Sequence, residues 1–377
     1  MVKNDLLTLN QVNVVIQEYF LRDFMTSTAH SQAINRAILR AIAKGQSHPA
    51  SAIAKEFGLS KTAVEARIRK LASAGLITAE GYGRARALQL SVLERKSFTV
   101  EPSGLDEHIV YLQNILPFLQ DASEEARTIW QYAFTEMLNN AIEHAGASKI
   151  DVVVQKTALS TRIMIKDDGE GIFRRIQRLA NLYDARAAIL ELAKGKFTTD
   201  PLRHSGEGIF FSSRAVDGFF LFSHELCFSH DPQQDWLLYQ EEEYTNGTLV
   251  VMDLENESQR SLTGVFSEFT EGEDSAFSKT IVPVRLAVHE GEQLISRSQA
   301  RRLSARFEMF RTVLLDFSGV KIIGQGFADE LFRVFASAHP NINLIPVRAN
   351  TDVQMMIAHV TTPFQPDSGK QLKSERF

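Results

Sequence analysis

The spacing of apolar residues divides the chain into three regions. Between residues 33 and 74 they recur every three or four positions, as in amphipathic helices. From Ser123 to Leu254 long helical patterns alternate with strand patterns, and from about Ala276 shorter strands and helices alternate again. Residues 256–275, rich in Ser, Glu, Thr and Gly, are predicted to form a linker. The pattern therefore predicts an α+β protein of several domains.

The length and composition agree with this division. A chain of 377 residues exceeds one ordinary core, and 44% hydrophobic with 23% charged residues is typical of globular proteins. The predicted parts are an N-terminal arm, a helical domain, a mixed domain, the linker, a small mixed domain and a polar tail expected to be disordered. Their bounds are 1–27, 28–92, 97–255, 256–275, 276–362 and 363–377.

The helical region has the signals of helices joined by a tight turn. Pro49 opens the second helix, Gly58 suits its left-handed C-cap, and Ser60 can cap a third helix from Lys61 to Ala74. A short hairpin follows, with residues 81–83 at its tip. Over about 60 residues this order resembles the winged helix-turn-helix of bacterial transcriptional regulators. A helical protein-interaction module with a solvated basic face is the alternative.

Positive charge is concentrated in the same region. Residues 27–96 contain 12 Lys and Arg against 4 Asp and Glu, whereas the whole chain has a net charge of −5. Because DNA phosphates attract such a local excess of cations, we expect DNA to bind here. The candidate contacts lie on the third helix and the hairpin: Lys61, Arg67, Arg69, Lys70, Arg84 and Arg86.

Composition also limits the cellular context. The one cysteine, Cys227, excludes an intrachain disulfide and a multi-thiolate metal site. The sequence contains no signal-peptide pattern, and no apolar run approaches the ~18 residues of a membrane span. We expect a cytoplasmic protein that does not contact the membrane.

Three segments of the middle region combine polar side chains with glycine turns. Glu136, Asn140 and His144 are spaced by four residues on one helix face, where they could serve a hydrated magnesium ion and an attacking water. An apolar strand then delivers Asp167 into a turn, where it can accept a hydrogen bond from an amine such as that of adenine. The third segment, 205–209, opens a helix whose N–H groups suit phosphate. Glycines that allow close approach of a ligand to these turns are Gly169, Gly171, Gly206 and Gly208.

In this order the segments, with the later pair Gly247-Thr248, resemble the GHKL ATPase superfamily, which includes gyrase and the histidine kinases. The resemblance covers about residues 123–254 and implies ATP and Mg²⁺ as cofactors. It implies that Asn140 is the magnesium ligand, that Asp167 binds adenine and that Glu136 is the base. The implied nucleotide-binding residues are Asn140, His144, Asp167, Gly169, Gly171, Gly206, Gly208 and Thr248.

The resemblance also implies a lid over the phosphates at residues 173–204. Several lid cations could reach phosphate, although a solvated charged face is the alternative. They are Arg174, Arg175, Lys194, Lys196 and Arg203.

The last region resembles STAS-like domains over about residues 280–360. The pattern predicts a helix from Ser296 to Arg311, a strand at 313–317, a turn, a second apolar strand and a helix. Its last helix begins near Gly324-Gln325-Gly326, which lacks the hydroxyl that anti-sigma-factor antagonists carry there. The resemblance implies a docking or dimerisation module, hence a protein partner or a homodimer.

Together these features favour an ATP-binding, nucleotide-controlled DNA-binding regulator, in which ATP and Mg²⁺ change the domain arrangement. Three alternatives remain open at this stage. They are an anti-sigma-type Ser/Thr protein kinase, a GHKL ATPase of DNA metabolism or phage defence, and a protein that keeps nucleotide as a structural ligand.

Overall fold

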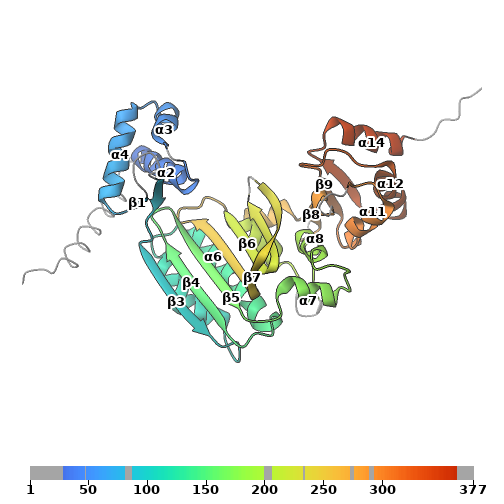
Figure 1. The fold of residues 1–377 in the computed structure, drawn as a ribbon, viewed down its shortest axis with the longest axis horizontal. Coiled ribbons are helices and arrows are strands. Elements are labelled where there is room, and N and C mark those ends of the chain that lie inside the picture. Colours follow the sequence, from blue (N-terminus) through green and yellow to red (C-terminus); the bar gives the residue numbers. More distant parts are fainter. Residues whose placement is uncertain are drawn as a thin grey trace, which may run out of the picture.

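The computed structural model describes residues 29–46, 48–80, 87–198, 206–231, 234–271, 276–287 and 293–362, with backbone alone at 231 and 234–245. Three groups of elements follow one another along the chain. Figure 1 shows a small helical unit at one end of a central sheet and a C-terminal unit beside the lid helices. None of the described helices is long and apolar enough to cross a membrane. The mixed, multidomain fold predicted from the sequence is confirmed.

The helical unit contains α2 (Ala29–Ala43), α3 (Ala50–Phe57) and α4 (Lys61–Ser73). Gly58 ends α3 with a left-handed φ of 65°, and the Ser60 hydroxyl accepts a hydrogen bond of 3.1 Å from the N–H of Ala63. Both capping predictions are therefore confirmed. The hairpin pairs β1 and β2 in antiparallel register, and its tip at 81–86 lies outside the described residues. The two strands are Ile77–Glu80 and Ala87–Leu90.

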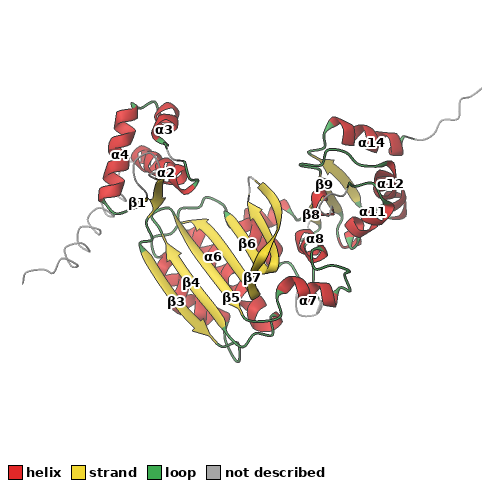
Figure 2. Ribbon diagram, viewed as in Figure 1, coloured by secondary structure: helices red, strands yellow, loops and turns green. Residues whose placement is uncertain are grey.

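The central domain is a five-stranded antiparallel sheet in the order β3-β4-β5-β7-β6. Alternate residues of β4 and β5, such as Val152 and Ile163, are buried against α6, which lies behind the sheet in Figure 2. This alternation is what the strand period of two requires of a sheet with one covered face. The strands are Glu94–Val100, Ile150–Lys156, Ser160–Asp167, Gly218–Asp231 (β6) and Gln234–Glu255 (β7).

Helices cover one face of this sheet, and two further helices lie in the region that the sequence predicted as the lid. The longest, α6, begins after Ser123, whose hydroxyl accepts from the N–H of Ala126, and buries Trp130 and Phe134. The helices are α5 (Glu107–Val110), α6 (Glu124–Asn139), α7 (Ile172–Leu179), α8 (Ala187–Lys194) and α9 (Gly208–Ala215). The remaining turns are a π-helix at Tyr111–Ile115, a 3-10 helix at Leu116–Leu119 and a π-helix at Asn140–His144.

The C-terminal unit has a three-stranded parallel sheet in the order β10-β9-β8, surrounded by short helices. Its strands are Lys279–Pro283 (β8), Thr312–Asp316 (β9) and Asn343–Val347 (β10). Its helical segments are Val284–Ala287 (3-10), Arg297–Ser304 (α11), Phe307–Met309 (3-10), Gln325–Asp329 (α12), Glu330–Phe335 (π), Ala336–Ala338 (α13) and Thr351–Thr361 (α14).

Two predictions for this unit were wrong. The helix expected from Ser296 to Arg311 ends at Ser304, because Ala305 is extended and Arg306 is left-handed with φ 67°. The second apolar strand after the turn is absent among the described residues, where Ile323 makes only an isolated bridge to Leu294. Both residues are buried, so the apolar run there serves packing rather than sheet pairing.

The predicted linker at 256–275 is also wrong in part, because it contains helix α10 (Leu262–Glu268). The Ser261 hydroxyl caps this helix by accepting a hydrogen bond of 3.0 Å from the N–H of Gly264. Val265 and Phe269 are buried in the C-terminal core. The burial of these two apolar residues accompanies a helix of seven residues in a stretch whose composition alone indicated a loop.

The C-terminal core extends into the central domain. Leu190 of α8 and Phe210 and Phe211 of α9 belong to the same buried cluster as the C-terminal strands. The ring centre of Phe210 lies 4.5 Å from that of Phe277, and Phe211 lies 4.2 Å from Phe266. These two parts of the chain are therefore joined by a shared apolar core.

This shared core yields a stability prediction. Phe277→Ala should lower the free energy of unfolding by about 3–5 kcal/mol, since it removes a buried ring from between α9 and the C-terminal strands. Hydrogen exchange should accelerate in both α9 and β9. Met355→Ala, at a position 61% exposed on α14, is the control and should change neither. Acceleration confined to β9 would contradict a shared core.

Candidate functional site

A cavity of about 280 Å³ lies between the end of α6, the strands β5 and β7, the lid helices and the start of α9. It collects most of the side chains and turns that the sequence singled out, from segments more than 100 residues apart. The predicted residues that line it are Glu136, Asn140, His144, Asp167, Gly171, Gly206, Gly208 and Thr248. Apolar side chains from the strands and lid, which sequence reasoning did not assign to the site, complete the wall; they include Ile165, Ile176, Leu192 and Val250.

The polar wall of the cavity is carried by an irregular helix end. Regular α-helix stops at Asn139, and residues Asn140–His144 form a π turn. A π turn holds more residues than an α turn, so the three predicted side chains are not stacked at ideal four-residue spacing. Glu136, Asn140 and His144 nevertheless all reach the cavity, as the sequence predicted.

Asp167 is held firmly at the end of β5. Its side chain is only 5% exposed, and its Oδ1 atom accepts hydrogen bonds from the N–H of Gly169 at 2.9 Å and of Thr248 at 3.1 Å. Burial raises the pKa of Asp167, while these hydrogen bonds oppose the shift. Thr248 is fixed in turn, because its hydroxyl accepts from the N–H of Ile172 at 3.0 Å. The backbone thus fixes the Asp167 carboxylate at the cavity wall.

The glycines serve different purposes. A Cβ atom at Gly208 would lie 2.1 Å from Oε2 of Glu136, so a larger residue there would displace this carboxylate from its position against α9. Gly169, in contrast, does not line the cavity: a Cβ there would lie 2.1 Å from the carbonyl oxygen of Ala145. Its position is required for packing the turn against Ala145 at the end of the π turn, rather than for the ligand approach that we expected.

The lid cations divide into two groups. Arg175 lines the cavity, whereas Arg174 is exposed and pairs with Glu225 at 3.7 Å. The ammonium of Lys194 is fully buried and donates to the carbonyl oxygen of Ala305 at 2.9 Å, so it faces the C-terminal unit. Lys196 likewise donates to the carbonyl oxygen of Met309 at 3.1 Å. Arg203 lies outside the described residues.

The interpretation of Lys194 and Lys196 as phosphate contacts was therefore wrong. A buried ammonium needs oxygen partners, and carbonyl groups more than 100 residues later in the chain supply them. Burial lowers the pKa of Lys194, while the nearby Glu191 carboxylate opposes that shift. No pattern within the lid sequence reveals this contact.

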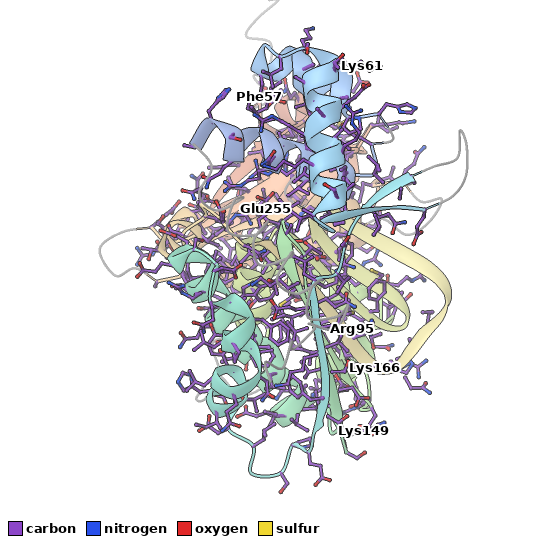
Figure 3. All side chains as sticks on the ribbon, turned by 90° about the vertical axis from the view of Figure 1, so that its left-hand side faces the viewer. Phe57, Lys61, Arg95, Lys149, Lys166 and Glu255 are labelled. Atoms are coloured by element: carbon purple, nitrogen blue, oxygen red, sulfur yellow. The ribbon has the colours of Figure 1, made fainter. Side chains whose placement is uncertain are left out.

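The candidate DNA-binding residues are also divided by the structure. Lys61, Arg69 and Lys70 are exposed on α4, and Lys61 lies at the end of that helix far from the sheet, as Figure 3 shows. Arg67 is half-buried and donates to the hydroxyl of Ser31 on α2 at 2.8 Å. Its expected DNA contact is not supported, because the side chain joins two helices. The other two candidates, Arg84 and Arg86, lie outside the described residues.

Two further cations of the helical unit bind the central domain. Arg40 donates to both carboxylate oxygens of Glu255 at 2.6 Å, and Arg36 pairs with Glu257. Figure 3 shows Glu255 where the helical unit meets the sheet. Sequence reasoning missed this contact because its acidic partners lie more than 200 residues away. Part of the basic excess is thus neutralised within the molecule.

Comparison with models of known protein families assigns each region. Residues 32–78 match a winged helix-turn-helix DNA-binding model, and residues 99–222 match a histidine kinase-like ATPase domain. Residues 299–354 match a STAS-like domain of unknown function. A search of curated proteins gives no match to the chain. The predicted order of a winged helix, a GHKL-type ATPase domain and a STAS-like domain is confirmed.

The geometry of Asp167 predicts a specific binding defect. Asp167→Asn should weaken ATP binding by roughly 10- to 150-fold, because a charge-assisted hydrogen bond of about 1.5–3 kcal/mol is lost. Calorimetric titration with ATP measures this. Asp168→Asn is the matched control, since Asp168 bonds Ser148 outside the cavity and should leave the affinity unchanged. Equal ATP affinities for Asp167→Asn and wild type would show that Asp167 does not bind the nucleotide.

The two arginines of α4 should behave differently in DNA binding. Arg69→Ala should weaken binding and reduce the slope of log affinity against log salt by about 0.9, as for one lost phosphate contact. Arg67→Ala should leave that slope unchanged and lower the stability of the winged helix, because it removes the bond to Ser31. Anisotropy titrations at several salt concentrations distinguish the two. A reduced slope for Arg67→Ala would restore it as a DNA contact.

Proposed function

We propose that this chain is an ATP-binding, DNA-binding regulator. The bound nucleotide controls how the winged helix is oriented relative to the ATPase domain, and hence its affinity for DNA. The observation that carries the proposal is the course of strand β7. It contributes Thr248 to the cavity and, seven residues later, Glu255 to the bidentate ion pair with Arg40 of the winged helix. A stretch of about 23 Å within one strand, seven residues at about 3.3 Å each, therefore connects the two sites.

The cavity suits a nucleotide in its charge distribution. Its apolar walls can enclose a base, and the buried Asp167 carboxylate provides one acceptor for an amine. The start of α9, where Gly206 and Gly208 line the cavity, presents backbone N–H groups and the positive end of a helix. Adenine would bind between the apolar walls beside Asp167, and the phosphates would bind at the start of α9.

The residues around the phosphate position suit Mg²⁺ and hydrolysis. Asn140 offers a neutral amide oxygen at the cavity wall, a ligand type that hard cations accept, and phosphate oxygens would supply further ligands. The metal would neutralise phosphate charge. Glu136 lies against Gly208, where its carboxylate can take a proton from water. The water oxygen then bonds to the γ-phosphorus as the bond to the ADP oxygen breaks.

This function predicts reciprocal coupling between nucleotide and DNA. Saturating ATP should change DNA affinity by roughly 5- to 150-fold, and DNA should change ATP affinity by the same factor. Glu136→Ala, which we expect to bind ATP without turning it over, should keep the full effect. The measurement is DNA titration of both proteins without nucleotide, with ADP and with ATP.

Arg40→Gln tests whether the coupling passes through strand β7 and its ion pair with the winged helix. It should reduce the coupling while ATP affinity stays unchanged, because Arg40 is outside the cavity. Superimposable DNA titrations with and without ATP would contradict nucleotide control. Transfer of the γ-phosphate to a protein hydroxyl, instead of its release, would support the kinase alternative.

A further inference from the structure

The end of the lid is held by the C-terminal domain. Lys194, the last residue of α8, donates to Glu191 at 2.8 Å and to the carbonyl oxygen of Ala305 at 2.9 Å. The hydroxyl of Thr280 on β8 donates to the carbonyl oxygen of Lys194 at 2.7 Å. Figure 1 shows α8 beside the C-terminal strands, in agreement with these bonds. The lid is therefore anchored where it leaves α8.

Arg306 of the C-terminal domain contacts three residues of the lid: Glu191, Lys196 and Phe197. Its Nη1 donates to Oε2 of Glu191 at 2.8 Å, and its Nη2 donates to the carbonyl oxygen of Lys196. Its guanidinium carbon lies 5.1 Å from the ring centre of Phe197. A planar guanidinium can make these contacts at once, because it presents several donors and a flat face.

Phe197 connects Arg306 with the expected phosphate turn. It lines the cavity, and its backbone lies so close to Gly206 that a Cβ atom there would be 2.5 Å from the Phe197 carbonyl. The path from Arg306 to the turn thus consists of two direct packing contacts. Arg306 itself is not among the residues that line the cavity.

The backbone of Arg306 is unfavourable for its residue type. Its φ of 67° is left-handed, a conformation that is strained for a non-glycine residue. The same turn ends α11 and directs the guanidinium to the lid. A glycine would fit this backbone without strain but would make none of the lid contacts.

We propose that Arg306 is a positioning residue for the nucleotide phosphates, supplied by the C-terminal domain. It holds residues 194–197 against Gly206, so that the phosphate turn is formed only while this domain is docked. The inference rests on the proposed binding of ATP. It makes the C-terminal domain part of the nucleotide site, beyond the docking or dimerisation role expected from its sequence.

The test uses three full-length variants: Arg306→Ala, Arg306→Gly and Arg306→Lys. Calorimetry with ATP and with adenosine separates the phosphate contribution from that of the base. Ala and Gly should weaken ATP binding by roughly 2- to 30-fold, the range of coupling through packed contacts. Adenosine affinity should not change, because Asp167 is held by other bonds. Lys should restore part of the ATP affinity by pairing with Glu191.

Two controls separate positioning from folding. Arg306→Gly removes the strained φ, and Lys194 with the shared aromatic core still anchors the domain, so this variant should stay folded. Hydrogen exchange at residues 194–197 should be faster in it than in wild type. Arg301→Ala changes a neighbouring arginine that is 69% exposed and paired with Glu330, and should leave ATP affinity unaltered.

The outcomes are distinct. Folded Ala and Gly variants that bind ATP as wild type does would overturn the role of Arg306 alone. Equal losses for ATP and adenosine would also overturn it, since the effect would not concern phosphate. A wild-type chain that fails to bind ATP would overturn the proposed function, and this inference with it.

Discussion

The close approach of α9 to its surroundings is the constraint on which the rest of the structure depends. The preceding Gly206 leaves no space for a side chain beside the backbone of Phe197, and the first residue of the helix, Gly208, lies against the Glu136 carboxylate. Two residues later, Phe210 and Phe211 enter the core of the C-terminal domain. A single short helix therefore fixes the expected phosphate position and the docking of the C-terminal domain at once.

The two outer domains are attached by different physical interactions. The C-terminal domain shares a buried aromatic core with α8 and α9, and salt does not screen such apolar burial as it screens ion pairs. The winged helix is joined through Arg36 and Arg40 to Glu255 and Glu257, and partly exposed ion pairs of this kind contribute little and are screened by salt. A smaller apolar contact adds to them, because Leu159 between β4 and β5 is buried in the core of the helical unit. Salt should therefore weaken the attachment of the winged helix more than that of the C-terminal domain.

Sequence patterns predicted the structure correctly where it depends on contacts between neighbouring residues. The turn at Gly58 and Ser60, the hairpin and the order of the three domains could be predicted because each depends on neighbouring residues. Contacts between distant segments could not. The lid lysines face carbonyl groups of the C-terminal domain, Arg67 bonds Ser31, and α10 occupies a stretch whose composition indicated a linker.

The sequence by itself determined the domain order and singled out short motifs, most of which line the cavity, since glycine spacing, capping and apolar period are local properties. Tertiary structure decided which of these motifs share one cavity and which cations remain available to a ligand. Arg306 illustrates the difference: nothing near it in sequence indicates a role, yet it reaches Glu191, 115 residues earlier in the chain. A charged side chain becomes a structural contact or a binding group according to the partners that folding places within hydrogen-bond distance.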